Sequence, residues 1–155
     1  MYALKQITRQ SVWVVLSTVA VLLSGCADMG MSNADKVMLS GSQEVPPVTT
    51  SASGSGTITV APDKSVTGSV TTTGVAATAA HIHNGAPGKN GPVIIPLVKT
   101  SDNVWSVPAG AKMTDAQHAS YRAGELYVNV HSAANKGGEI RGQLNTNAPQ
   151  RSGTY

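Results

Sequence analysis

The sequence predicts an all-β protein, an antiparallel Greek-key β-sandwich with one short connecting helix near residues 114–122. Between residues 37 and 144, apolar and polar side chains alternate with a period of two, which is typical of half-buried strands. Glycine, proline and asparagine residues, which favour turns, separate these segments at short intervals. Charged residues make up only 12% of the chain, which argues against a disordered or a long helical protein.

The alternating segments define eight expected strands. The clearest pair is a hairpin, in which residues 57–60 and 65–71 flank the turn Pro62-Asp63-Lys64. The other segments are bounded by turn residues in the same way. In chain order, these remaining strands are expected at residues 37–41, 78–83, 92–98, 103–107, 125–131 and 138–144.

One segment carries the signals of a helix. Thr114 and Gln117 fit a capping box, in which the threonine hydroxyl caps the first turn and the glutamine side chain reaches back. Residues 116–122 favour a helix, and Gly124 suits the position after its last turn. His118 lies in the middle of this helix among polar neighbours, and we expect it to be a solvated side chain.

The charge balance gives no case for a nucleic-acid partner. The 155-residue chain has a formal net charge of +3 and a pI near 9.2. The first 25 residues contain Lys5 and Arg9 but no acid, so the rest of the chain has nine basic and eight acidic residues. A nearly neutral chain without a basic run does not attract a polyanion. Its length predicts a single folded domain.

The first 25 residues have the pattern of a signal peptide. Two basic residues precede the mostly apolar segment 11–23, which is too short for an ordinary transmembrane helix. The following Leu23-Ser24-Gly25-Cys26 resembles the lipobox of bacterial lipoproteins. That resemblance implies lipidation of Cys26 with acyl chains such as palmitate, after which Cys26 is the new N-terminus. The alternative is a buried core helix, but a core helix does not normally start at a basic terminus.

The lipobox resemblance also predicts where the protein is found. Cys26 is the only cysteine, so no intrachain disulfide can form. Ala27 follows it, a pattern that in Gram-negative lipoproteins goes with sorting to the outer membrane. We therefore expect a lipid-anchored protein of the cell envelope that faces the periplasm or the cell surface. Residues 26–36 are expected to form a polar tether, and residues 146–155 a disordered tail.

Three of the four histidines fall on expected strands. Neighbouring side chains of a strand point to opposite faces, so His81 and His83 point away from the core if Ile82 points into it. In the segment 126–131, apolar residues alternate up to Val130, which places His131 on the face opposite the core. All three imidazoles are therefore expected to avoid the core.

Three imidazoles on one sheet face can bind a metal ion. Neutral imidazole binds zinc or copper at about 2.0–2.1 Å, and three such ligands leave one position open. Copper is favoured by the general order of affinities, and zinc is equally compatible with these residues. Asn129 and Glu139 are the nearest candidates to hold the distal ring nitrogens. Alternatively, the histidines are ordinary polar positions on an exposed face, because the sequence does not establish that residues 78–83 and 125–131 pair.

Five segments in a fixed order resemble the CHRD domain, which is named from chordin and also occurs in bacterial secreted proteins. The resemblance runs from Leu39 to Leu144, and it implies an all-β module over residues 37–145 whose biochemical activity is poorly defined. His118 lies outside these segments. They are LSGSQEVPP (39–47), AHIHNG (80–85), GKNGP (88–92), GELYVNVH (124–131) and GGEIRGQL (137–144).

A second similarity concerns the copper side of Cu,Zn superoxide dismutase. His81-x-His83, a later strand that ends in Val-x-Val-His131, and Gly-x-x-Arg141 follow the same pattern. The similarity implies copper ligands at the three histidines, Arg141 near the open position, and a sandwich of immunoglobulin-like or superoxide-dismutase-like type. Two features of the dismutase pattern are not found in this sequence. No histidine-rich zinc loop lies between His83 and His131, and a single cysteine cannot form the dismutase disulfide. The similarity therefore supports copper binding more than dismutase activity.

Three functions are compatible with these observations. The first is a membrane-anchored envelope module with a histidine site for a transition metal, copper above all. The second is a metal-free module in which the polar sheet face, or the segment 44–47, binds an envelope protein or a glycan. The third is a metal-dependent oxidoreductase of superoxide-dismutase type. This function ranks last, because the sequence shows no separate general base, and we therefore expect no catalytic residue.

Overall fold

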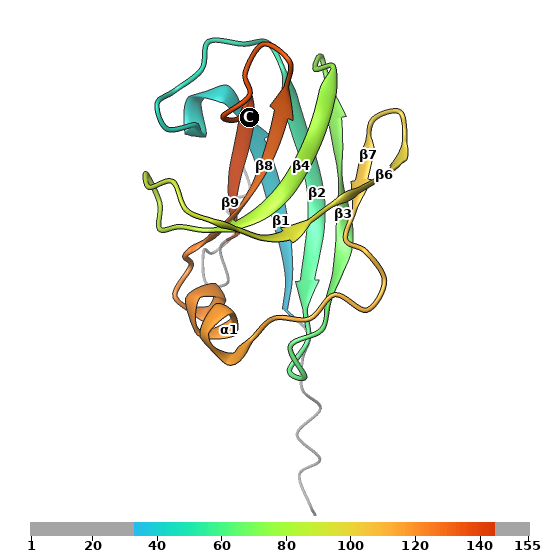
Figure 1. Cartoon of the computed structure of the whole chain (residues 1–155), viewed down its shortest axis with the longest axis vertical. Helices are drawn as coiled ribbons and strands as arrows, with labels where there is room; N and C mark the ends of the chain where they lie inside the picture. Colours follow the sequence, from blue (N-terminus) through green and yellow to red (C-terminus); the bar gives the residue numbers. More distant parts are fainter. Residues whose placement is uncertain (1–32, 145–155) are drawn as a thin grey trace, which may run out of the picture.

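The computed structural model describes residues 33–144 and confirms the all-β class (Figure 1). Within the described residues, the one α-helix, α1 (Asp115–Arg122), lies at one end of the sheet, and a 3-10 turn, η1 (Gly41–Gln43), follows the first strand. The strands are β1 (Asn33–Ser40), β2 (Ser53–Val60), β3 (Val66–Thr73), β4 (Ala77–Asn84), β5 (Val93–Pro96), β6 (Val98–Ser101), β7 (Val104–Ser106), β8 (Leu126–Ser132) and β9 (Ile140–Leu144).

The strands form one antiparallel sheet in the order β5-β4-β8-β9-β1-β2-β3-β7-β6. The two ends of this order are joined by the chain, because only Leu97 separates β5 from β6. The backbone N–H of Leu97 donates to the carbonyl of Ala80 in β4 at 2.9 Å. The sheet is therefore nearly closed on itself. The late strand β9 lies beside β1 of the β1-β2-β3 meander, so the first and the last strand of residues 33–144 are neighbours in the sheet.

Several expected strand boundaries differ from the structure; β2, for example, begins at Ser53 rather than at residue 57. β1 begins at Asn33 rather than at residue 37, and residues 33–36 pair with β2. The carboxylate of Asp35 faces inward there and accepts a hydrogen bond, a feature that the apolar alternation does not reveal. The expected strand 92–98 is divided at Leu97, where the chain passes from pairing with β4 to pairing with β7.

The core lies inside the curved sheet, and strand parity decides which residues fill it. Ile82 of β4 and Val130 of β8 are both 0% exposed, as the alternation predicts. Two long connections, residues 41–52 and 85–92, lie on the same side of the molecule, at the left of Figure 1. The side-chain amide of Asn90 joins them by donating to the carbonyl of Val45 at 2.7 Å.

The helix α1 is capped as expected. The backbone N–H of Gln117 donates to the hydroxyl of Thr114 at 3.2 Å, and the N–H of Thr114 donates to the side-chain carbonyl of Gln117 at 2.9 Å. Gly124 follows with φ +74°, the left-handed conformation that glycine adopts most readily. Within residues 33–144, no helix has the length and apolar character needed to cross a membrane.

A buried hydrogen bond fastens α1 to β1. The hydroxyl of Tyr121 donates to the carboxylate of Asp35 at 2.5 Å, and the two residues are 1% and 7% exposed. Burial raises the pKa of Asp35, and the hydrogen bond from Tyr121 lowers it in part. Burial and the hydrogen bond to Asp35 both raise the pKa of Tyr121. The contact therefore stabilises a carboxylate that would otherwise be poorly solvated.

The substitution Tyr121→Phe tests this contact. It should lower the free energy of unfolding by about 1–3 kcal/mol at neutral pH, because a buried carboxylate loses its donor. The deficit should shrink as the pH falls, because Asp35 becomes protonated. Urea unfolding of the single variants and of the double variant with Asp35→Ala measures the coupling. An equal effect of Tyr121→Phe with and without Asp35 would contradict this account.

Candidate metal centre

The three strand histidines come together on the outer face of β4 and β8. β4 pairs with β8 in a register that places His81 opposite Asn129 and Ala79 opposite His131. His131 is therefore the diagonal neighbour of His81, while His83 follows two residues further along β4. The pairing that the sequence could not establish is thus present. It places the three side chains on one patch of the sheet.

The ring nitrogens of His81, His83 and His131 form a compact group. One nitrogen from each ring lies within 4.8 Å of the other two, and Nδ1 of His81 is 3.0 Å from Nε2 of His131. An ion bound at about 2.0–2.1 Å separates its ligand nitrogens by at most ~4.2 Å. The group can therefore hold a metal ion after a small rotation that brings the most distant ring closer.

Two backbone carbonyls determine which nitrogen of the His83 ring and of the His131 ring carries the proton. Nδ1 of His83 is 2.9 Å from the carbonyl oxygen of Gly91, and Nδ1 of His131 is 3.0 Å from that of Lys136. Because a carbonyl oxygen only accepts, the proton of each ring is on Nδ1 and the lone pair of the neutral ring is on Nε2. This is the arrangement that outer-shell carbonyls produce in metal sites.

Nε2 of His83 has no hydrogen-bond partner among the residues that the structure describes, although it is buried. The residue is 8% exposed, so water has little access. An unsatisfied buried acceptor costs about 1–3 kcal/mol, and such groups are rare in folded proteins. A metal ion bound at this nitrogen would satisfy it. The chemistry of the donor set therefore fits a bound cation.

The tautomer of His131 also determines the tautomer of His81. Since Nε2 of His131 carries a lone pair, Nδ1 of neutral His81 must be the donor in their 3.0 Å contact. In the metal-free protein, a proton thus lies between two of the three candidate ligands. A metal ion that uses both nitrogens has to displace this proton, so binding is coupled to a change of tautomer at His81.

The surroundings of His81 and His83 favour their neutral rings. Burial lowers the pKa of His81, and the neighbouring His131 and His83 lower it further. Burial also lowers the pKa of His83, with smaller contributions from His131 and Arg141, while the hydrogen bond to Gly91 acts in the opposite direction. Neutral imidazole is the form that binds metal ions, so the surroundings favour the ligand state.

A stack of three side chains supports His83. The ring of Tyr127 lies parallel to the His83 ring, with 4.9 Å between centroids and an interplanar angle of 10°. Cζ of Arg141 lies 3.4 Å from the centroid of the same tyrosine ring. The Tyr127 hydroxyl accepts from the N–H of Gly91 at 3.1 Å, the residue whose carbonyl holds His83. The stack thus restricts the orientation of one candidate ligand.

The three side chains expected around the metal make other contacts. Asn129 donates to the carboxylate of Glu44 at 2.5 Å and to the carbonyl of Ile140 at 3.3 Å. Glu139 accepts from the hydroxyl of Thr50 at 2.9 Å. Arg141 packs against the Tyr127 ring, which in turn stacks on His83. The partners of the distal ring nitrogens are the carbonyls of Gly91 and Lys136, which lie in loops and carry no residue-type signal.

Glu44 is a buried acid that the alternation does not reveal, because it follows β1 in an irregular segment. It is 6% exposed, and burial raises its pKa to about 7, against the lowering effects of Asn129 and Arg141. A Cβ atom at Gly138, where φ is +138°, would lie 2.7 Å from the Glu44 carboxylate and 2.5 Å from the Asn129 amide. Because glycine has no Cβ atom, Gly138 leaves room for the Glu44 and Asn129 side chains.

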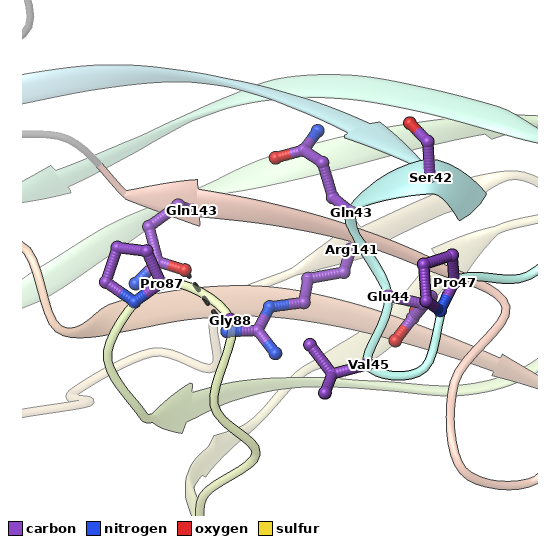
Figure 2. A pocket seen from close by; sticks show the side chains of 9 residues that line it. All are labelled: Ser42, Gln43, Glu44, Val45, Pro47, Pro87, Gly88, Arg141 and Gln143. Carbon is purple, nitrogen blue, oxygen red and sulfur yellow. Dashed lines mark hydrogen bonds between the residues drawn. The ribbon is translucent and has the colours of Figure 1, made fainter.

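A pocket of about 420 Å³ opens beside the cluster (Figure 2). It lies between the segment after β1, the loop after β4, and β9. Arg141 and Gln143 of β9 approach it from the sheet side, and Figure 2 shows the hydrogen bond between them. The lining residues are Ser42, Gln43, Glu44, Val45, Pro47, Pro87, Gly88, Arg141 and Gln143.

The sequence also singled out His118, Cys26 and the segment 44–47. His118 is in α1, half-buried, with its ring 6.1 Å from that of Tyr121, and it is not part of the histidine group. Cys26, the expected lipidation site, lies outside the described residues. The segment 44–47 does not form an exposed strand edge, because its first residue is buried and it belongs to an irregular connection.

Comparison with known proteins agrees with the resemblance of the five segments. The family model of the CHRD domain matches residues 36–144, which is most of the chain and close to the range that the motifs cover. No curated protein and no solved structure matches the chain significantly. The matched range contains all three clustered histidines together with Glu44 and Arg141. The chain therefore belongs to the CHRD domain family.

Proposed function

We propose that this CHRD domain binds one transition metal ion, copper above all, through His81, His83 and His131. The observation that carries the proposal is the buried Nε2 of His83, which has no partner within residues 33–144 and belongs to a group of three convergent imidazoles. An ordinary polar sheet face would leave this nitrogen in water or pair it with a donor. The geometry supports metal binding over a metal-free interaction surface for this reason.

The preference for copper rests on ligand type. Three neutral nitrogen ligands without a carboxylate or thiolate suit copper or zinc, and copper has the higher general affinity among divalent first-row ions. The protein's own residues orient two of the rings through backbone carbonyls and exclude water from His83. We infer that the domain sequesters or delivers the metal in the cell envelope.

Metal titration tests the proposal. The full chain, purified in a mild non-ionic detergent and stripped with a chelator, should bind about one Cu(II) or Zn(II) in competition with a chelator of known affinity. His83→Ala should weaken binding by ~100-fold or more, because even loss of an outer-shell partner costs 10–100-fold. His81→Ala and His131→Ala should also weaken it strongly.

His118→Ala is the matched control, since His118 lies outside the cluster and should not contribute. Binding no tighter than millimolar would overturn the proposal, as would an unchanged affinity after all three cluster histidines are replaced. The metal-free interaction module would then be the better interpretation of the domain.

We also propose that the domain is anchored to the outer membrane through acyl chains on Cys26. The support is the segment 11–23 followed by Leu23-Ser24-Gly25-Cys26 and then Ala27. A single acyl chain binds a membrane weakly and reversibly, whereas two or more give a stable anchor. This attachment would hold the metal-binding domain at the membrane surface.

Cys26→Ser tests the anchor, because serine has no sulfur to receive the first lipid. In a Gram-negative expression host, the original chain should be found in the outer-membrane fraction and should gain mass from labelled palmitate. The variant should incorporate no label and should leave the outer-membrane fraction. Met29→Ser, a change close to the cysteine, should behave as the original chain. Firm membrane association and labelling of the Cys26→Ser variant would contradict the assignment.

A further inference from the structure

The pocket of about 420 Å³ beside β9 contains a buried cation without an ion-pair partner. Arg141 is 1% exposed, yet it lines the pocket. The ion pairs found within residues 33–144 join Lys64 to Asp115 and Lys112 to Asp63, so no carboxylate lies within 4.0 Å of the Arg141 guanidinium. A buried guanidinium that lacks an anion is costly, because its desolvation is not compensated by an opposite charge.

The hydrogen bonds of Arg141 compensate for this only in part. Its Nη atoms donate to Asn90 at 3.4 Å, to the carbonyl of Ala86 at 3.3 Å and to Gln143 at 3.2 Å. All three acceptors are neutral, and the distances exceed the ~2.7–2.9 Å of a charge-assisted bond to a carboxylate. The guanidinium has five N–H donors, so it retains donors for a further acceptor.

Glu44, the acid in the pocket wall, attracts the Arg141 guanidinium but forms no ion pair with it within 4.0 Å, so it compensates the buried charge only in part. The carboxylate of Glu44 accepts from Asn129 instead, and burial raises its pKa to about 7. A carboxyl group in this environment is largely uncharged at mildly acidic pH. The pocket therefore has a net positive field there, and an entering anion meets little repulsion from Glu44.

The remaining wall selects the kind of anion. Val45, Pro47 and Pro87 line the pocket with apolar groups, and its volume suits a small molecule. We propose that this pocket binds a small organic acid, with the carboxylate on the Arg141 guanidinium and a short carbon chain against Val45 and the two prolines. The planar fork of a guanidinium matches a carboxylate in a bidentate manner. The site is separate from the histidine cluster, so it does not depend on bound metal.

Nuclear magnetic resonance tests the assignment on the full chain in mild detergent, at pH 6, at constant ionic strength and with a chelator present. Sodium butyrate should cause saturable shifts of the Gly88 amide and of the Arg141 Nε–H signal. Acetate and phosphate should bind more weakly than butyrate. Arg141→Gln should weaken butyrate binding by ~10-fold or more, which corresponds to the loss of charge-assisted hydrogen bonds. Arg122→Gln, an exposed position on α1, is the control and should change nothing.

A matched pair at Gly88 keeps the test valid if Arg141→Gln fails to fold. A Cβ atom at Gly88 would meet nothing within 4 Å, and its φ of +73° is one that Asp and Asn tolerate better than most residues. Gly88→Asp places a carboxylate in the pocket wall and should weaken butyrate binding by ~10-fold or more. Gly88→Asn has the same shape without the charge and should bind as the original chain.

Three results would overturn the assignment. The first is the absence of saturable shifts with butyrate, which would make Arg141 a purely structural cation. The second is equal binding by the Gly88→Asp and Gly88→Asn variants. The third is tighter binding of phosphate than of butyrate, which would favour an inorganic oxyanion. None of these results bears on metal binding by the histidines, because a chelator is present throughout.

Discussion

The antiparallel pairing of β4 with β8 is the constraint on which the other features depend. Its register sets His81 opposite Asn129 and makes His131 a diagonal neighbour of His81. A shift of β4 by one residue relative to β8 would turn Ile82 outward and His81 and His83 into the core, which the burial of Ile82 opposes. Apolar burial on the inner face thus fixes the histidine cluster on the outer face.

The loops beside this outer face orient the histidine rings through hydrogen bonds. Gly91 and Lys136 supply carbonyls that place the protons of His83 and His131 on Nδ1 and their lone pairs on Nε2. The lone pair of His83 has no partner within residues 33–144, and that of His131 accepts from His81. Tyr127 then stands between His83 and Arg141, and it separates the histidine cluster from the pocket at β9. One aromatic ring therefore contacts a residue of each candidate site.

Much of the fold could be predicted because it depends on local patterns. Period-two alternation gives the strands and the inward direction of Ile82, and the residues Thr114 and Gln117 give the helix start. The pairing of β4 with β8 depends on contacts between residues far apart in sequence, such as His81 and His131, which are 50 residues apart. The alternation of apolar and polar residues does not indicate which strands pair. The carbonyls and Glu44 escaped prediction because they lie in irregular segments, where burial follows the path of the loop.

The central claim is that the protein holds His83 and His131 as Nδ1–H tautomers, so that a metal ion can bind at their Nε2 lone pairs. Long-range ¹H–¹⁵N correlation spectra of the histidine rings measure this directly in the metal-free chain. The account predicts the Nδ1–H tautomer for both rings, and it predicts that added Zn(II) shifts their Nε2 resonances while the Nδ1 protons remain. An Nε2–H tautomer at His83, or Nε2 resonances that do not respond to zinc, would contradict it.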